Sequence, residues 1–142
     1  MTRGELLAFM PSVPNCPTHL GAESYAVPTL RWLQGPFWDF FKKRLWDANL
    51  DKWQVRWECR DFARAYASTA LECWAKTVGG TTDDGLAVGE VWFLPDQRGQ
   101  AAEGHAVCPC ITDEGMIWID PQVNTVWPYS PVELASRYFL RW

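Results

Sequence analysis

Residues 57–66, WECRDFARAY, carry the feature that decides the fold. From Cys59 onward, apolar residues recur every three or four positions, which predicts a helix with one buried face. The positions on that face are Phe62, Ala63, Tyr66, Ala70, Cys73 and Trp74. Glu58 and Asp61 put negative charge into the first turn, where the helix dipole favours it. Gly79-Gly80 are typical of the end of such a helix. The sequence therefore predicts a central helix that begins with a cysteine.

The position of Cys59 in this helix decides its chemistry. Free N–H groups and the positive end of the dipole stabilise a thiolate at a helix N-terminus, and the thiolate is the nucleophilic form. Trp53, Val55 and Trp57 alternate with polar residues, which predicts an extended approach that turns into the helix near Cys59. A helix that began at Asp51 would instead place Cys59 in mid-helix and remove this advantage.

Length and composition favour one domain over residues 1–142 with a real hydrophobic core. The chain has 48% hydrophobic residues, and ten of its residues are tryptophan. Its net charge is −4 and its longest basic run is Lys42-Lys43-Arg44, so we expect no nucleic-acid partner. The sequence has no run of about 18 apolar residues, so we expect no membrane-spanning helix. The N-terminus does not resemble a secretory signal. The five cysteines are irregularly spaced, which indicates free thiols and a cytoplasmic protein.

Residues 1–50 are expected to be a helical part of uncertain role. Short helices are predicted in 6–10 and 28–34, and a longer one from Pro36 to a stop near Asn49. The longer helix has a wide apolar surface made by Phe37, Trp38, Phe40, Phe41, Leu45 and Trp46. We interpret these aromatic residues mainly as core, with the floor of a substrate cleft or a partner surface as alternatives.

The second half of the chain predicts an antiparallel meander followed by a closing helix. Asp113-Glu114-Gly115 is a tight turn between two strands, and Pro109 predicts that the first of them is irregular or at an edge. The expected strands are 86–94, 105–112, 116–120 and 123–127. Ser130 begins a capping-box pattern, which predicts a helix over 131–140. The predicted fold is α+β, with an antiparallel sheet of three to four strands packed on the central helix.

Two strand ends supply further candidate site residues. His105 opens one strand and Asp120 ends the next, so both lie at the same end of the predicted hairpin. An aspartate that accepts the Nδ1–H would orient the imidazole, which would then pair with the Cys59 thiolate as a general base. Less specific interpretations remain, since a lone cysteine is often a packing residue and Asp120 before Pro121 could be a turn residue.

Three short motifs around these residues resemble those of a known enzyme family. Cys59-Arg-Asp-Phe-Ala, Gly104-His105-Ala-Val and Trp118-Ile-Asp120-Pro121, in this order, resemble the transglutaminase-like branch of the papain-like cysteine enzymes. The resemblance covers roughly residues 53–121. It implies a catalytic triad of Cys59, His105 and Asp120. It also implies an oxyanion donor upstream of the cysteine, for which Gln54 is the candidate beside the Cys59 N–H, with Trp53 or Trp57 as alternatives. We expect no cofactor.

The function expected from these residues is that of a cysteine hydrolase, of peptidase or amidase type, or an acyl transferase. Its substrate would be a peptide, amide or ester that forms an acyl-enzyme thioester with Cys59. The alternative is a catalytically silent papain-like fold that binds a protein through its tryptophan-rich N-terminal part.

The remaining cysteines are expected to be packing residues. Cys73 falls on the apolar helix face, and Cys108 and Cys110 share one strand face. Cys16, His19, Cys108 and Cys110 could in principle bind zinc, but their spacing is not that of a zinc site, so we expect no metal.

Overall fold

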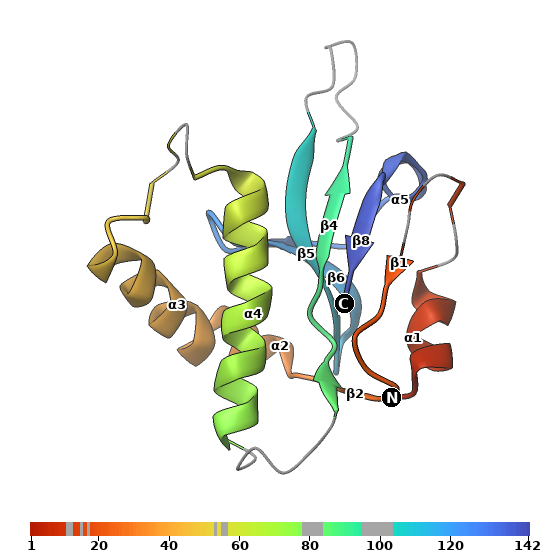
Figure 1. Cartoon of the computed structure of the whole chain (residues 1–142), viewed down its shortest axis with the longest axis horizontal. Helices are drawn as coiled ribbons and strands as arrows, with labels where there is room; N and C mark the ends of the chain where they lie inside the picture. Colours follow the sequence, from red (N-terminus) through yellow and green to blue (C-terminus); the bar gives the residue numbers. More distant parts are fainter. Residues whose placement is uncertain are drawn as a thin grey trace.

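The computed structural model describes residues 1–10, 13–14, 16, 18–52, 54, 57–77, 84–94 and 104–142. Within these residues, a six-stranded and mostly antiparallel sheet lies beside a long helix (Figure 1). The helices are α1 (Arg3–Phe9), α2 (Leu30–Gln34), α3 (Pro36–Asp47), α4 (Cys59–Thr77) and α5 (Pro131–Ser136). The strands are β1 (Thr18–His19), β2 (Tyr25–Ala26), β3 (Gly85–Leu86), β4 (Glu90–Phe93), β5 (His105–Thr112), β6 (Gly115–Asp120), β7 (Thr125–Trp127) and β8 (Phe139–Arg141).

The order of the strands across the sheet is β1-β8-β4-β5-β6-β7, and β2 and β3 form a separate parallel pair. Only β1 and β8 pair in parallel within the large sheet. This arrangement, in which a central helix packs on a mostly antiparallel sheet, confirms the predicted α+β fold class. The sheet has six strands rather than three to four, because β1 and β8 extend it beyond β4.

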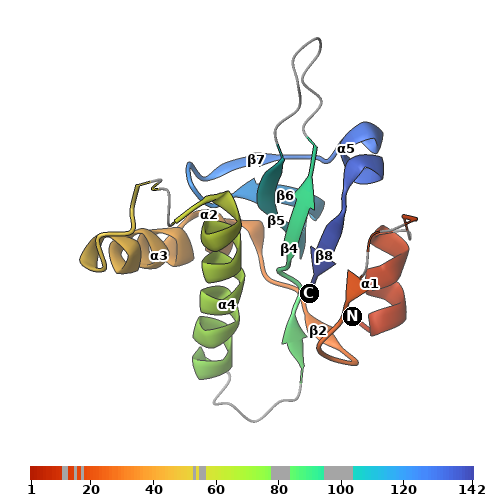
Figure 2. The same ribbon diagram turned by 45° about the horizontal axis from the view of Figure 1, so that its top comes forward.

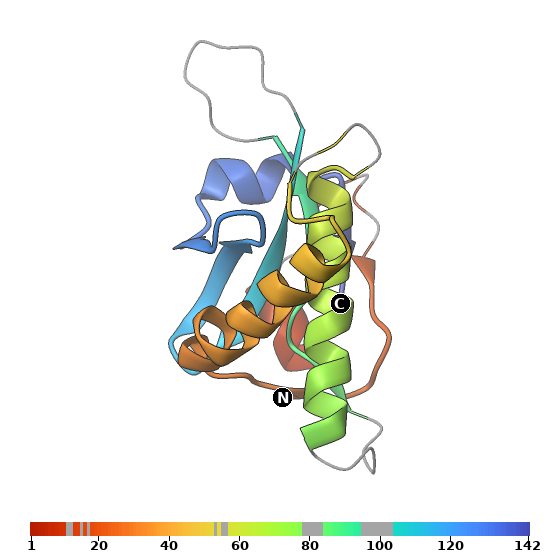
Figure 3. The same ribbon diagram turned by 90° about the vertical axis from the view of Figure 1, so that its left-hand side faces the viewer.

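The central helix α4 buries the face that its periodicity predicts. Its buried residues are Phe62, Ala63, Tyr66, Thr69 and Ala70. They pack against the α4-facing side of β5 and β6 and against α2 and α3, which cross beside α4 (Figure 3). Aromatic edges join the helices, since the Tyr66 ring meets Phe37 and Phe41 in T-shaped contacts. This core fixes the position of α4, and therefore of Cys59, against the sheet.

The opposite face of the sheet is also covered (Figure 2). Val107 on β5 and Trp118 on β6 are buried there with Val91 and Leu140, and residues near α1 and α5 pack against them. Strand β5 is therefore buried on both faces, with alternate residues pointing into different cores. Pro109 does not place β5 at an edge, because β5 lies between β4 and β6. The regular β4–β5 pairing stops after the Val91–Val107 pair. Pro109, which has no N–H to donate, lies where this pairing is interrupted.

The C-terminal prediction is wrong in part. The capping box forms as predicted, since Ser130 accepts a hydrogen bond from the Glu133 N–H and the Glu133 carboxylate accepts one from the Ser130 N–H. The helix nevertheless ends at Ser136 rather than continuing to Leu140, and 139–141 form β8. The physical reason is burial: α5 has no buried residue to sustain it, whereas Leu140 is fully buried beside β4. The predicted strand 86–94 is likewise two strands, β3 and β4.

The aromatic surface of α3 divides between the core and solvent. Phe37, Phe41 and Leu45 are buried, as predicted. Phe40 is 49% exposed and Trp46 is 67% exposed, so each of these two aromatic side chains faces solvent. Asn49 has a positive φ of 55° just after the helix, which agrees with the predicted stop.

None of the helices in the described part of the chain combines the length and the apolar character that a membrane span requires.

Candidate active site

Cys59 is the first residue of α4, as its sequence context predicts. The Glu58 carbonyl accepts the hydrogen bond from Phe62 N–H that begins the helix, and the Asp61 carboxylate accepts one from the Glu58 N–H at 3.0 Å. These two bonds close the first turn. The Cys59 and Arg60 N–H groups therefore lie at the open end of the helix, where they have no intrahelical acceptor.

Two described residues before the helix, Gln54 and Trp57, pair with each other. Gln54 and Trp57 exchange two backbone hydrogen bonds, of 3.0 and 2.8 Å, so their backbones pair with each other. Trp53 and Val55, which contributed to the prediction of an extended approach, lie outside the described residues. The start of α4 at Cys59 excludes the alternative of a helix that begins at Asp51.

His105 and Asp120 come together at one end of the β5–β6 pair. The pairing of Cys108 with Ile119, continued by one residue, places Asp120 opposite Val107. Asp120 is thus a diagonal neighbour of His105 on the same face of the sheet. The distance from His105 Nε2 to Asp120 Oδ2 is 3.0 Å, with side chains that are 27% and 15% exposed. The second Asp120 oxygen accepts a hydrogen bond from Gln122 N–H, so the carboxylate is held at both oxygens.

The structure corrects the prediction of which His105 ring nitrogen contacts Asp120. The expected partner of the aspartate was Nδ1, but the structure gives this hydrogen bond to Nε2. Because His105 opens β5 and the backbone fixes the direction of the ring, Nε2 reaches β6 and Nδ1 is left for the Cys59 side. The role of Asp120 as the orienting partner is the same with either nitrogen.

Cys59 and His105 change each other's protonation. A hydrogen bond with His105, and further bonds from the Ala106 and Arg60 N–H groups, lower the pKa of the Cys59 thiol below its usual value. The hydrogen bond to Asp120, followed by the hydrogen bond to Cys59, raises the pKa of His105 to about 9. Both shifts favour a thiolate beside an imidazolium at neutral pH. Cys59 is only partly buried, whereas Cys108 and Cys110 are buried.

Sequence reasoning missed the N–H of Ala106 as a partner of the sulfur. A backbone donor leaves no signal in residue type, and only its place directly after His105 could have suggested it. Gln54 does not meet the cysteine: its exposed side chain donates a hydrogen bond to the Asn49 carbonyl at 3.0 Å. This geometry gives no support to Gln54 as an oxyanion donor. The Trp57 indole N–H is buried and has no hydrogen-bond partner among the described residues.

The remaining thiols are free and have other environments. Cys108 and Cys110 are fully buried beneath α4, which confirms them as packing residues, and burial raises the pKa of both. Cys73 is partly buried on α4, where desolvation also raises its pKa. In the part of the chain that the structure describes, no three His, Cys, Asp or Glu side chains gather as a metal site. The zinc alternative on Cys16, His19, Cys108 and Cys110 therefore has no support from geometry.

No protein-family model matches this sequence, and no curated protein matches it. Among solved structures, the chain is similar to the protein of the PSL1a–E64 complex, with a TM-score of 0.74 and 17% identity over 100% of this chain and 51% of the other. It is also similar to Polyporus squamosus lectin bound to a human-type influenza-binding epitope, with a TM-score of 0.73 and 16% identity over 100% of this chain and 49% of the lectin. The chain thus spans about half the length of each of these proteins. At these identities the likeness establishes a shared fold.

Proposed function

We propose that this protein is a cysteine hydrolase that cleaves a peptide or amide bond, of the transglutaminase-like branch of the papain-like enzymes. The observation that carries the proposal is that His105 contacts both Asp120 and Cys59. One ring nitrogen holds the Asp120 carboxylate at 3.0 Å, and the ring also hydrogen bonds to Cys59 at the start of α4. A nucleophile, a base and an orienting carboxylate in this order are the components of a catalytic triad.

The proposed reaction uses these groups in two stages. The Cys59 sulfur attacks the substrate carbonyl, and the His105 imidazolium gives its Nδ1 proton to the leaving nitrogen as the carbon–nitrogen bond breaks. A thioester remains on Cys59. Water then attacks the thioester, His105 takes a proton from that water, and the carbon–sulfur bond breaks to release the acid and the thiolate. The free N–H of Cys59 is the oxyanion donor that this site offers directly.

The structural neighbours support this proposal in one respect. One of them is described as a complex with E64, a cysteine protease inhibitor. If the shared fold extends to a shared chemistry, Cys59 should react with the same compound. The transfer of an acyl group to an amine instead of water is the variant reaction of the same thioester.

The decisive experiment is labelling with E64 at neutral pH, followed by intact-mass and peptide mass spectrometry. We expect one adduct per chain, on Cys59, and no adduct in Cys59→Ala. Cys73→Ala is the matched control, because Cys73 is also a partly buried cysteine on α4 but has a raised pKa. The proposal fails if Cys59 reacts no faster than a free cysteine, or if His105→Gln leaves its reaction rate unchanged.

A second candidate is a binding module without turnover. The observation in its favour is that Phe40 and Trp46 are both exposed on α3, together with similarity to a lectin bound to a glycan epitope. Binding of a protein or glycan that survives Cys59→Ala but is lost in Trp46→Ala, with no hydrolysis of peptides, amides or esters, would favour this candidate.

A further inference from the structure

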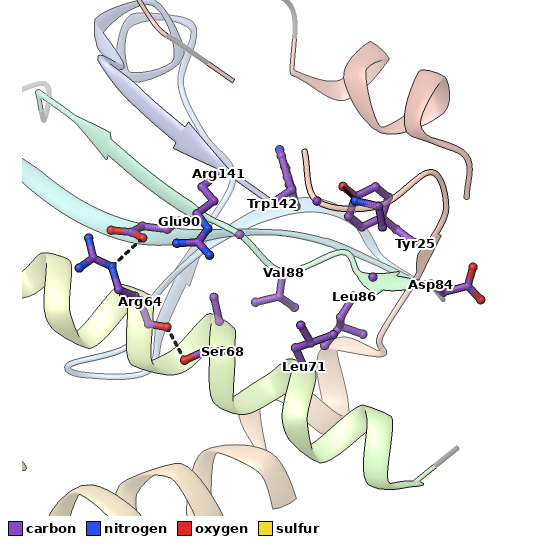
Figure 4. Close-up of a pocket in the computed structure, with 15 residues that line it drawn as sticks. Tyr25, Arg64, Ser68, Leu71, Asp84, Leu86, Val88, Glu90, Arg141 and Trp142 are labelled. Carbon is purple, nitrogen blue, oxygen red and sulfur yellow. Dashed lines mark hydrogen bonds and ion pairs between the residues drawn. The ribbon is translucent and has the colours of Figure 1, made fainter. Parts of the chain in front are cut away.

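A cavity lies away from the candidate triad. It opens between α4, the β3–β4 segment and Trp142, and its volume is about 350 Å³ (Figure 4). Neither Cys59 nor His105 lines it. The volume falls within the range of small-molecule binding sites in proteins. The cavity is therefore a candidate ligand site that the triad does not use.

One end of the cavity carries three charged side chains. Glu90 is buried, with a side chain that is 2% exposed, and both of its oxygens have protein partners. One oxygen accepts the Trp92 indole N–H at 2.7 Å, and the other lies 3.5 Å from Arg64 Nε. Arg64 on α4 thus compensates the Glu90 charge across the gap between helix and sheet. The Glu90 carboxylate has no oxygen left without a partner.

The third charge is Arg141. It lies directly opposite Glu90 in the β4–β8 pair and is exposed at the cavity. Figure 4 shows its guanidinium on the cavity side of the sheet, near Glu90 and Val88. Among the described residues, its side chain makes no hydrogen bond and no ion pair. Two guanidinium groups against one carboxylate leave about one unit of positive charge at this end.

The other walls are apolar. Leu71 of α4 faces Leu86 and Val88 of the β3–β4 segment, and the Trp142 ring closes the side (Figure 4). Asp84 lies at the far end, away from the arginines, where it accepts a hydrogen bond from the Ser24 hydroxyl. A ligand that fits this surface has an apolar body and a single negative charge at one end.

We propose that this cavity binds a small organic carboxylate with an apolar body. Arg141 holds the carboxylate through a charge-assisted, two-pronged hydrogen bond, with Arg64 beside it. The apolar body lies between Leu71 and Val88. A monoanion matches the single uncompensated charge better than a phosphate, which would bring a second negative charge next to Glu90. This proposal does not depend on the proposed hydrolase activity.

The test is isothermal titration calorimetry with three probes of equal chain length: octanoate, octanol and octylamine. We expect saturable one-to-one binding of octanoate and binding that is weaker by about tenfold or more for the other two, because a hydrogen-bonded ion pair is lost. Arg141→Gln should weaken octanoate by about the same factor. Arg31→Gln is the matched control, since Arg31 is an exposed arginine on α2, outside the cavity.

A second variant tests the place of binding independently of charge. Ser68 is exposed on α4 and lines the cavity, so Ser68→Phe fills the space without disturbing the core, and we expect it to abolish octanoate binding. The proposal is overturned if octanoate does not bind the wild-type chain, if octylamine binds as tightly, or if Arg141→Gln and Ser68→Phe both bind octanoate normally. Labelling of Cys59 in the same variants reports separately on the triad.

Discussion

His105 and Asp120 are diagonal neighbours across the β5–β6 pair, with 3.0 Å between Nε2 and Oδ2. The sheet register places them there, and the tight turn that includes Gly115 sets that register, with a φ of 104° at the glycine. The Asp120 carboxylate is held by the Gln122 N–H, so it is a fixed partner rather than a mobile one. The ring of His105 is therefore oriented by groups that lie on the same sheet as itself.

The first prediction concerns the protonation of His105. Asp120→Asn removes the carboxylate whose hydrogen bond is the largest cause of the raised pKa, so the pKa of His105 should fall from about 9 toward the usual 6.5. The measurement is an NMR titration of the imidazole carbon-bound protons. The chain has two histidines, and His19→Gln assigns the two signals.

The control for this titration is Asp47→Asn. Asp47 is an exposed carboxylate on α3 that pairs with Lys43, so its removal changes the net charge by the same amount. His105 should keep its raised pKa in this variant. An unchanged His105 titration in Asp120→Asn would show that Asp120 does not orient the ring in solution.

The second prediction is a pH dependence of stability. A raised folded-state pKa means that the contribution of His105 is fully present below the unfolded value of 6.5 and is lost as the pH rises through about 9. The difference in free energy of unfolding between the wild type and Asp120→Asn should therefore be larger at pH 6 than at pH 10. Urea unfolding at the two pH values, with reductant present, measures it. A difference that grows with pH would contradict the assignment.

The third prediction concerns the first turn of α4. Asp61→Ala removes the acceptor of the Glu58 N–H, which should cost about 1 kcal/mol of stability and loosen the turn that holds Cys59. The alkylation of Cys59 by iodoacetamide should slow, because the Arg60 N–H no longer holds a fixed position beside the sulfur. Asp61→Asn keeps an acceptor oxygen and should restore most of the stability and the rate. Equal loss in both variants would point to charge rather than hydrogen bonding.

Much of the candidate site could be predicted because its residues stand at the ends of elements. Charge and periodicity identify the start of α4 at Cys59, and glycine and proline identify the strand ends at His105 and Asp120. What could not be predicted depends on direction in space. The choice of Nε2 over Nδ1 follows from where the first residue of β5 points. The hydrogen bond that Gln54 donates to the Asn49 carbonyl is a contact in space, which no local pattern encodes.

The fold, like the site, was predictable where local sequence signals decide the structure. The capping box at Ser130 is a local signal, and it formed. The end of that helix is not local, because 139–141 can form a strand only where β4 offers an open edge to pair with. The sequence analysis assigned 131–136 and 139–141 to one helix. The cap at Ser130 is visible in the sequence, whereas the pairing with β4 is not. Tertiary pairing decided the state of the last strand.

The last prediction tests that strand. Leu140 is fully buried beside Val91 in the β4–β8 pair, so Leu140→Ala should cost about 2–5 kcal/mol of stability. Val132→Ala on the exposed side of α5 is the control and should change stability by less than about 0.5 kcal/mol. Denaturant unfolding measures both, and hydrogen exchange should find the Leu140 amide protected as a sheet amide is. If the two variants are equally stable, the C-terminal segment is not a core strand in solution, and the sheet ends at β4.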